Sequence, residues 1–85
     1  MTAVVTAYTW TGSVCADGHW PCLGECAAPR WVPLHTRVLI GGHEYLVTDR
    51  MNRRYPDRWD IYQSTRRTAL EFGIQKLTVN IPQLP

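Results

Sequence analysis

The chain has 85 residues, 45% of them hydrophobic, and a net charge of +2. This length allows one folded domain with a modest core. A charged fraction of 19% without long runs of like charge argues against an intrinsically disordered chain. No apolar run approaches the roughly 20 residues of a membrane helix, so we expect no membrane span.

The first third of the chain predicts one strand followed by a long loop. Residues 4–10 are rich in β-branched and aromatic side chains, which suit a pleated sheet. Residues 1–8 contain no basic n-region, long apolar stretch or cleavage site, so we expect no signal peptide. Residues 11–33 hold several glycines and prolines and all three cysteines, which is typical of a functional or crosslinked loop.

The middle of the chain predicts a β-hairpin. Residues 36–40 and 43–48 favour two strands because both segments are rich in β-branched or aromatic side chains. Gly41-Gly42 between them indicates a tight turn, since glycine accepts the positive φ angles that such turns require. The second strand ends at Asp49, which places a carboxylate at the strand end.

A short helix is predicted in the last third of the chain. Ser64 is the expected N-cap, because its hydroxyl can accept a hydrogen bond from a free amide of the first turn. Gly73 is expected to end the helix at the C′ position after about two turns. The side chains expected to face inward are Ala69, Leu70 and Phe72.

Two further strands complete the predicted elements. A polar loop at residues 51–58 leads to a short strand at residues 59–62, and residues 75–81 form the last strand. Five or so short strands with one helix leave little room for crossovers. We therefore predict a mostly β fold, a small closed barrel over residues 1–85, since an open sheet would leave an exposed edge.

Asp49 and Asp60 are the strongest candidates for chemistry. They lie eleven positions apart across one loop, and aspartate is disfavoured in strands. An aspartate between Trp59 and Ile61 therefore needs a reason. One interpretation is a structural carboxylate that accepts backbone or arginine hydrogen bonds at the base of the loop. The other is a catalytic pair.

Five segments occur in one order at close spacing. They are Thr-Ala-Tyr at residues 6–8, Val-Pro-Leu-His-Thr-Arg-Val at 32–38, Val-Thr-Asp at 47–49, Trp-Asp-Ile-Tyr-Gln at 59–63 and Ala-Leu-Glu-Phe-Gly at 69–73. Together they resemble the three-aspartate domain family of bacterial cell-wall proteins and phages. That family is similar to the catalytic barrel of membrane-bound lytic transglycosylase A and to rare lipoprotein A-like domains. The resemblance implies a six-stranded double-psi β-barrel.

Position by position, Asp49 matches the second aspartate of the family and Asp60 the third. The third is the proposed catalytic acid of lytic transglycosylase A, and Ile-Tyr-Gln follows it there too. The first family aspartate precedes a proline and is missing, because its place falls at Ala28 or at a gap beside it. Other departures are Arg50, Met51 and Asn52 in place of Thr-Gly-Gly, and His35 in place of a glycine.

The resemblance implies cleavage of the glycosidic bond between MurNAc and GlcNAc in peptidoglycan. Asp60 would protonate the leaving oxygen, and its setting beside Trp59 and near Asp49 would raise its pKa. No cofactor is implied. The alternative is a catalytically inactive barrel that serves as a phage virion component or a glycan-binding module. The missing first aspartate favours this alternative, whereas the retained pair favours the enzyme.

Aromatic side chains are candidates for stacking on sugar rings, although in small domains many aromatics belong to the core. Those in turn-rich loops are the better candidates for a groove. The residues that we expect to contact substrate are Tyr8, Trp20, Tyr55 and Trp59.

The cysteine-rich loop contains side chains of the types that bind zinc. Cys15, His19, Cys22 and Cys26 provide four soft ligands within twelve residues, but their spacing fits no standard zinc motif, so we expect no metal. One disulfide is favoured in an oxidising compartment, and three free thiols in a reducing one.

The positive charge does not predict a nucleic-acid partner. The arginine-rich part of the chain lacks regularly interleaved aromatics and any known nucleic-acid motif, so we interpret it as a solvated surface. A mildly positive rim also suits peptidoglycan or a related glycan, the expected partner, and other virion proteins are partners if the chain is phage-encoded. Without a signal peptide, we expect a virion-associated protein or one released to the cell wall by another factor. The arginines concerned are Arg50, Arg53, Arg54, Arg58, Arg66 and Arg67.

Overall fold

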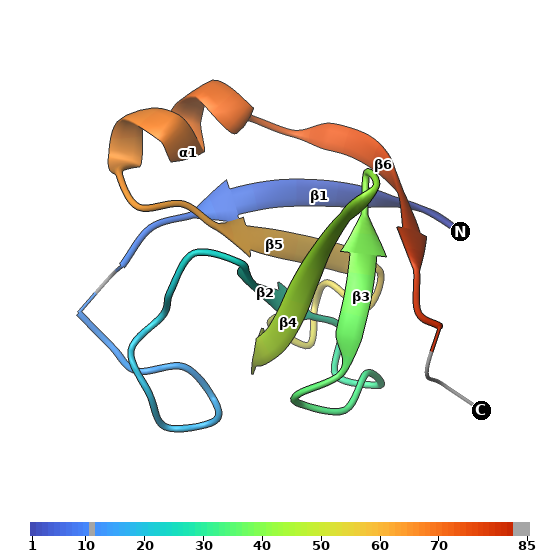
Figure 1. Ribbon diagram of the computed structural model, residues 1–85, viewed down its shortest axis with the longest axis horizontal. Coiled ribbons are helices and arrows are strands. Elements are labelled where there is room, and N and C mark those ends of the chain that lie inside the picture. The colour runs from blue at the N-terminus through green and yellow to red at the C-terminus, as the bar shows by residue number, and fades with distance from the viewer. Residues whose placement is uncertain (11, 83–85) are drawn as a thin grey trace.

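The computed structural model describes residues 1–10 and 12–82, in which six strands close into a barrel and one short helix lies outside it (Figure 1). The strands follow one another around the barrel in the order β1-β5-β2-β4-β3-β6. The elements are β1 (Thr2–Tyr8), β2 (Glu25–Ala28), β3 (Arg37–Ile40), β4 (His43–Arg50), β5 (Arg58–Tyr62), α1 (Arg66–Phe72) and β6 (Gln75–Asn80).

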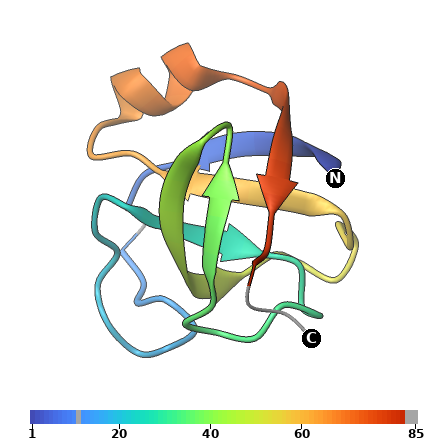
Figure 2. The same ribbon diagram turned by 45° about the vertical axis from the view of Figure 1, so that its right-hand side comes forward.

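The barrel mixes parallel and antiparallel pairing. β1 runs parallel to β5, and β2 runs parallel to β4, whereas the remaining neighbours are antiparallel. The two views place α1 outside the barrel, where it packs against β1 (Figures 1 and 2). This arrangement confirms the predicted mostly β barrel with one helix, and it is compatible with a double-psi topology.

The predicted hairpin between β3 and β4 is confirmed. Ile40 pairs with His43, so the turn contains only Gly41 and Gly42. Their φ angles are 58° and 84°, both in the region that a side chain disfavours. Two positive φ angles define the type I′ turn that matches the twist of the flanking strands.

The prediction of an uninterrupted loop at residues 11–33 is wrong, because β2 (Glu25–Ala28) lies inside it. This strand has only four residues and follows a stretch with several glycines, so its sequence is too short to show the alternating pattern of a strand. It is a strand because it has partners on both sides: β4 in parallel and β5 in antiparallel orientation. Tertiary pairing, rather than local propensity, defines it.

The helix confirms Gly73 as its end but differs at its start. The N-cap is Thr65, not Ser64: Thr65 has extended backbone angles, and its Oγ1 accepts a hydrogen bond from the Thr68 amide at 3.1 Å. Leu70, expected to face inward, is 67% exposed. A helix that covers the barrel with one stripe buries positions three apart, here Ala69 and Phe72 in part, and turns the position between them toward solvent.

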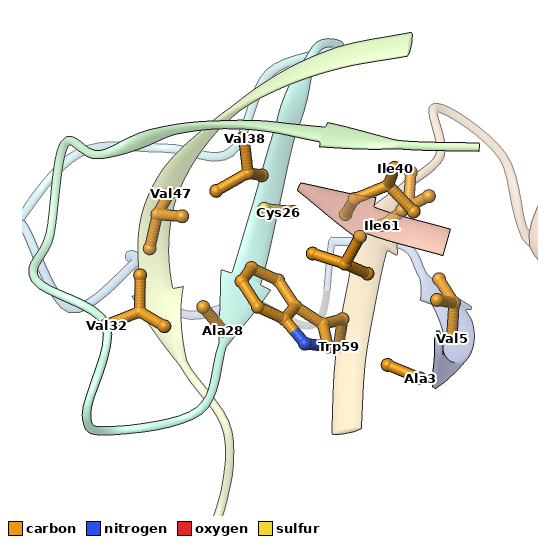
Figure 3. Close-up of a cluster of buried hydrophobic side chains, with 11 residues drawn as sticks. Ala3, Val5, Cys26, Ala28, Val32, Val38, Ile40, Val47, Trp59 and Ile61 are labelled. Carbon is orange, nitrogen blue, oxygen red and sulfur yellow. The ribbon is translucent and has the colours of Figure 1, made fainter. Parts of the chain in front are cut away.

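The core fills the barrel from all six strands (Figure 3). Trp59 is its largest member and has no exposed surface. In the antiparallel register of β2 and β5, Cys26 faces Ile61, and continuing that register places the small side chain of Ala28 across from Trp59. The buried core comprises Ala3, Val5, Cys26, Ala28, Val32, Val38, Ile40, Val47, Trp59, Ile61 and Val79.

None of the helical segments in the described part of the chain has the length and apolar character needed to span a bilayer.

The hairpin turn gives a direct test of the fold. Gly41→Val should lower the free energy of unfolding by about 2 kcal/mol, because a β-branched residue is strained at positive φ. Gly41→Asn should lie much closer to wild type, since asparagine tolerates that region. Urea unfolding of the three proteins measures both effects. An equal loss in the two variants would show that the conformation of the turn is not the cause.

Candidate functional site

The alternation of side chains along β5 places Asp60 on the outer face of the barrel, next to β1. Alternate residues of β5 point to opposite faces, so that Trp59 and Ile61 enter the core and Asp60 and Tyr62 point outward. On β1, Thr6 lies beside Asp60 in the register. The Thr6 hydroxyl donates a hydrogen bond to Asp60 Oδ1 at 2.9 Å, which orients the carboxyl group.

Asp60 sits in a partly buried environment that favours its neutral form. Burial raises the pKa of Asp60 to about 6, the Thr6 hydrogen bond acts in the opposite direction, and the charge of Asp49 adds to the increase. The carboxyl group is therefore half-protonated near pH 6 and can both give and accept a proton close to neutrality.

Asp49 lies near the end of β4 and binds the long loop. Its Oδ1 accepts hydrogen bonds from the backbone amides of Ala16, at 3.0 Å, and Arg50, at 2.8 Å. Ala27 on β2 pairs with Asp49 on one side and Asp60 on the other. Two strand spacings separate the aspartates, so their Cα atoms are roughly 10 Å apart. The structure thus brings the predicted pair to one surface.

A groove of about 300 Å³, here called the acid groove, opens between these aspartates. Arg50, Met51 and Asn52 contribute to its wall. Tyr8 and Tyr55, two of the four aromatic candidates, also line it. The full lining is Tyr8, Ala27, Asp49, Arg50, Met51, Asn52, Tyr55 and Asp60.

The Tyr8 hydroxyl is buried and has no hydrogen-bond partner among the described residues. Burial raises the pKa of this phenol well above its usual value, and nearby Cys15, Asp49 and Asp60 raise it further. The group therefore keeps its proton and remains a hydrogen-bond donor. A buried hydrogen-bond donor without a partner lowers the stability of the fold. Such a donor is expected where a ligand or a water molecule supplies the acceptor.

The other two aromatic candidates lie elsewhere. Trp59 is a core residue with no exposed surface and offers no face to a substrate, which corrects that expectation: the strand alternation that turns Asp60 outward turns Trp59 inward. Trp20 is 57% exposed and lines a different groove together with Trp10, Pro21 and Tyr62.

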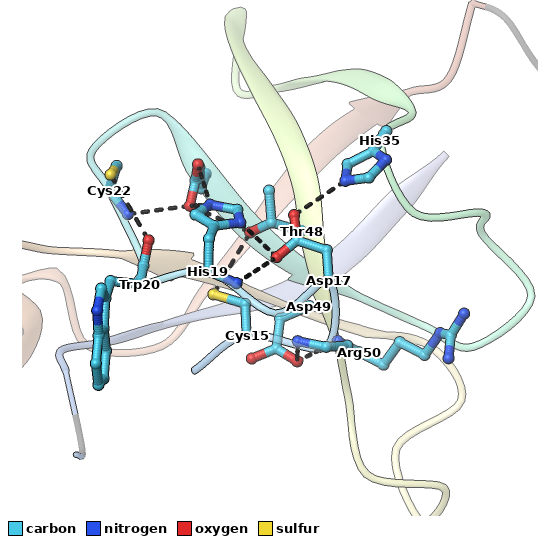
Figure 4. Close-up of polar contacts among 11 residues, drawn as sticks. Cys15, Asp17, His19, Trp20, Cys22, His35, Thr48, Asp49 and Arg50 are labelled. Atoms are coloured by element: carbon cyan, nitrogen blue, oxygen red, sulfur yellow. Dashed lines mark hydrogen bonds and ion pairs between the residues drawn. The ribbon is translucent and has the colours of Figure 1, made fainter. Parts of the chain in front are cut away.

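A network of histidines and carboxylates fastens the long loop to the barrel (Figure 4). Asp17 contacts His19 Nδ1 with one oxygen and His35 Nε2 with the other, the latter at 2.9 Å. The second ring nitrogen of His19 lies 2.9 Å from Glu25. Sequence reasoning missed Asp17 and Glu25: Asp17 links His19 of its own loop to His35, 18 positions away, and no motif in the sequence marks this contact.

The charges of this network support one another. Burial alone would raise the pKa of Asp17, but hydrogen bonds from His35 and His19 outweigh it and hold the pKa below its usual value. The hydrogen bond to Glu25 raises the pKa of His19. The loop that supplies the Ala16 amide to Asp49 is therefore held by ion pairs as well as by backbone contacts.

The cysteines form no crosslink. Cys15 and Cys26 are buried free thiols, and Cys22 is an exposed one. Burial raises the pKa of Cys26 to about 12 and also raises that of Cys15, so neither is poised as a thiolate. Both ring nitrogens of His19 face carboxylates. Among residues 1–10 and 12–82, no group of three or more His, Cys, Asp or Glu side chains is arranged to hold a metal ion.

Comparison with known proteins gives one short likeness. Over 37 residues, 44% of this chain, the sequence is 60% identical to a Bacillus subtilis protein called B-enzyme. The matched segment covers 26% of that protein, so the chain spans about a quarter of the curated relative it matches. No family model matches the chain, and no solved structure matches it.

The raised pKa of Asp60 predicts an unusual stability effect. The folded state holds this proton more tightly than the unfolded chain, whose pKa is near 3.8, so Asp60 should make the fold less stable as pH rises from about 4 to 6. Asp60→Asn should therefore raise the unfolding free energy at pH 7.5 by on the order of 1 kcal/mol, after allowance for solvent screening.

Thermal unfolding at pH 4 and pH 7.5 measures this effect. The melting temperature of the variant should exceed that of wild type by several degrees at pH 7.5 and match it at pH 4. Asp57→Asn is the matched control, because Asp57 is exposed and carries the same charge. A lower melting temperature for Asp60→Asn at pH 7.5 would instead identify Asp60 as a structural carboxylate.

Proposed function

We propose that this chain is a peptidoglycan-active domain similar to the three-aspartate family, which cleaves the MurNAc–GlcNAc bond as a lytic transglycosylase. The observation that carries the proposal is a half-buried carboxyl group, Asp60, with a pKa near 6 in an open groove. The buried and unpaired hydroxyl of Tyr8 in the same groove supports a ligand site.

The reaction needs one residue that gives a proton and later takes one back. Protonated Asp60 donates its proton to the glycosidic oxygen, and the bond between that oxygen and the anomeric carbon breaks. The 6-hydroxyl of the MurNAc ring then bonds to the anomeric carbon and returns its proton to Asp60. The product is an anhydro sugar, no water is consumed, and the enzyme ends in its starting state.

The other groove residues fit supporting roles. The carboxylate of Asp49 lines the same groove as Asp60, where it would stabilise positive charge on a bound sugar ring and so lower the barrier. The Tyr8 phenol, which keeps its proton, is a donor for a sugar oxygen. The short likeness to a protein called B-enzyme adds a relative whose name denotes an enzyme.

The proposal is tested with purified cell walls. Wild type should release fragments that end in an anhydro sugar, and Asp60→Asn should release them more slowly by on the order of a hundredfold or more, because the amide cannot deliver the proton. Mass spectrometry separates these fragments from hydrolysis products, which are heavier by one water.

Asp57→Asn again serves as the control, since it removes one charge outside the acid groove. Reducing ends in place of anhydro ends would replace the transglycosylase with a hydrolase. Equal release by Asp60→Asn and wild type would remove Asp60 from the chemistry.

The pH profile provides an independent test of Asp60 as the acid. Only the protonated form can start the reaction, so kcat/KM should be constant at low pH and fall above about pH 6. The hydrogen bond from Thr6 lowers the pKa of Asp60, so Thr6→Val should move this descending limb to higher pH. A limb that Thr6→Val leaves in place would belong to another group.

A second function is favoured by the surroundings of Ala28. This residue, at or beside the place of the family's missing first aspartate, is fully buried and belongs to the core. The acid groove thus has two carboxylates where the family has three aspartates. An inactive barrel that binds glycan, or that builds a phage virion, is the corresponding proposal. It predicts that wild type pellets with cell walls or assembles with virion proteins and releases no fragments.

A further inference from the structure

Two exposed indoles form a second groove beside the acid groove. Trp10 and Trp20 are 54% and 57% exposed, and their ring centroids lie 5.4 Å apart with the planes at 82°. With Pro21 and Tyr62 they line a cavity of about 420 Å³, here called the aromatic groove. In an edge-to-face pair the edge of one indole lies against one face of the other, and the remaining ring faces stay outside this contact.

The aromatic groove adjoins the acid groove through β5. Tyr62 follows Asp60 by two positions and points to the same outer face, so their Cα atoms lie roughly 7 Å apart. The Tyr62 ring also contacts the Tyr8 ring edge-on, at 5.6 Å between centroids, and Tyr8 lines the acid groove. The aromatic groove and the Asp60 carboxyl group therefore occupy neighbouring outward positions of one surface.

We propose that the aromatic groove is a saccharide subsite, which holds the sugar ring next to the one positioned at Asp60. This inference rests on the proposed function for the identity of the glycan. The C–H groups on the apolar face of a pyranose carry partial positive charge and fit the negative face of an indole. Trp10, Trp20 and Tyr62 offer such faces, and the acid groove supplies the hydrogen-bonding groups that fix orientation.

The loop beneath Trp20 is held in place before any ligand binds. His19, its neighbour, contacts both Asp17 and Glu25, and the backbone amide of Cys22 donates to Glu25 at 3.0 Å. Figure 4 shows the Trp20 indole directed away from this cluster, free of the polar network. A side chain on an anchored loop loses less conformational entropy on binding, which favours a ligand site.

The size of the groove favours a small ligand over a protein partner. Its volume lies in the range of small-molecule sites, about 300 to 1,000 Å³. A stable protein interface needs roughly 800 Å² on each partner and some 20 residues, whereas four residues line this groove.

Isothermal titration calorimetry with a β-1,4-linked N-acetylglucosamine tetramer tests the inference. Wild type and Asp60→Asn should bind the tetramer, and Trp20→Ala should weaken binding by about tenfold or more. Trp20→Phe should recover part of the affinity, because it restores a ring face. Ile74→Ala is the matched control: Ile74 is 73% exposed and lies outside both grooves, so its variant should bind as wild type does.

The outcomes separate this inference from the proposed function. Binding that depends on Trp20, without release of cell-wall fragments, supports the subsite and rejects the enzyme. Release of anhydro fragments with equal affinity in wild type and Trp20→Ala supports the enzyme and overturns the subsite. A wild type that does not bind the tetramer also overturns the subsite. A melting temperature at or above that of wild type shows that each variant is folded.

Discussion

The burial of Trp59 is the constraint on which the rest of the structure depends. A strand shows alternate side chains to its two faces, so placing this indole in the barrel fixes the direction of every other residue of β5. Ala28 provides the space across from it, and a larger or charged residue there would meet the indole. The outward face of β5 then has to carry Asp60 and Tyr62, flanked by β1 and β2.

The candidate site lies on that outer face, and burying the Asp60 carboxyl group there costs folding free energy. Asp60 is half-buried between two strands, where a neutral carboxyl group is more stable than a charged one. A charged group at such a position weakens the fold at neutral pH, and functional sites commonly carry such a loss of stability. The single hydrogen bond from Thr6 offsets only part of that cost.

Local signals in the sequence were sufficient where the structure is local. The Gly41-Gly42 turn and the end of the helix at Gly73 follow from short-range chemistry, whereas the closed β-barrel was predicted from the number of short strands and the cost of an open sheet edge. The N-cap was misplaced by one residue because two adjacent hydroxyl residues satisfy the same rule. The pairing of β2 and the inward direction of Trp59 depend on the register between distant strands. The Asp17 network joins separate loops. None of these features has a signal in a short window of the sequence.

The position of β1 has a consequence for how the barrel forms. Its only neighbours in the barrel are β5 and β6, and paired residues such as Thr6 and Asp60 are 54 positions apart. On a growing chain, β1 therefore stays unpaired while the β3–β4 hairpin can already close, and closure across long sequence separations is slow. The acid groove, which spans β1 and β5, therefore forms only once β5 has emerged, while β6 still has to close the barrel between β3 and β1.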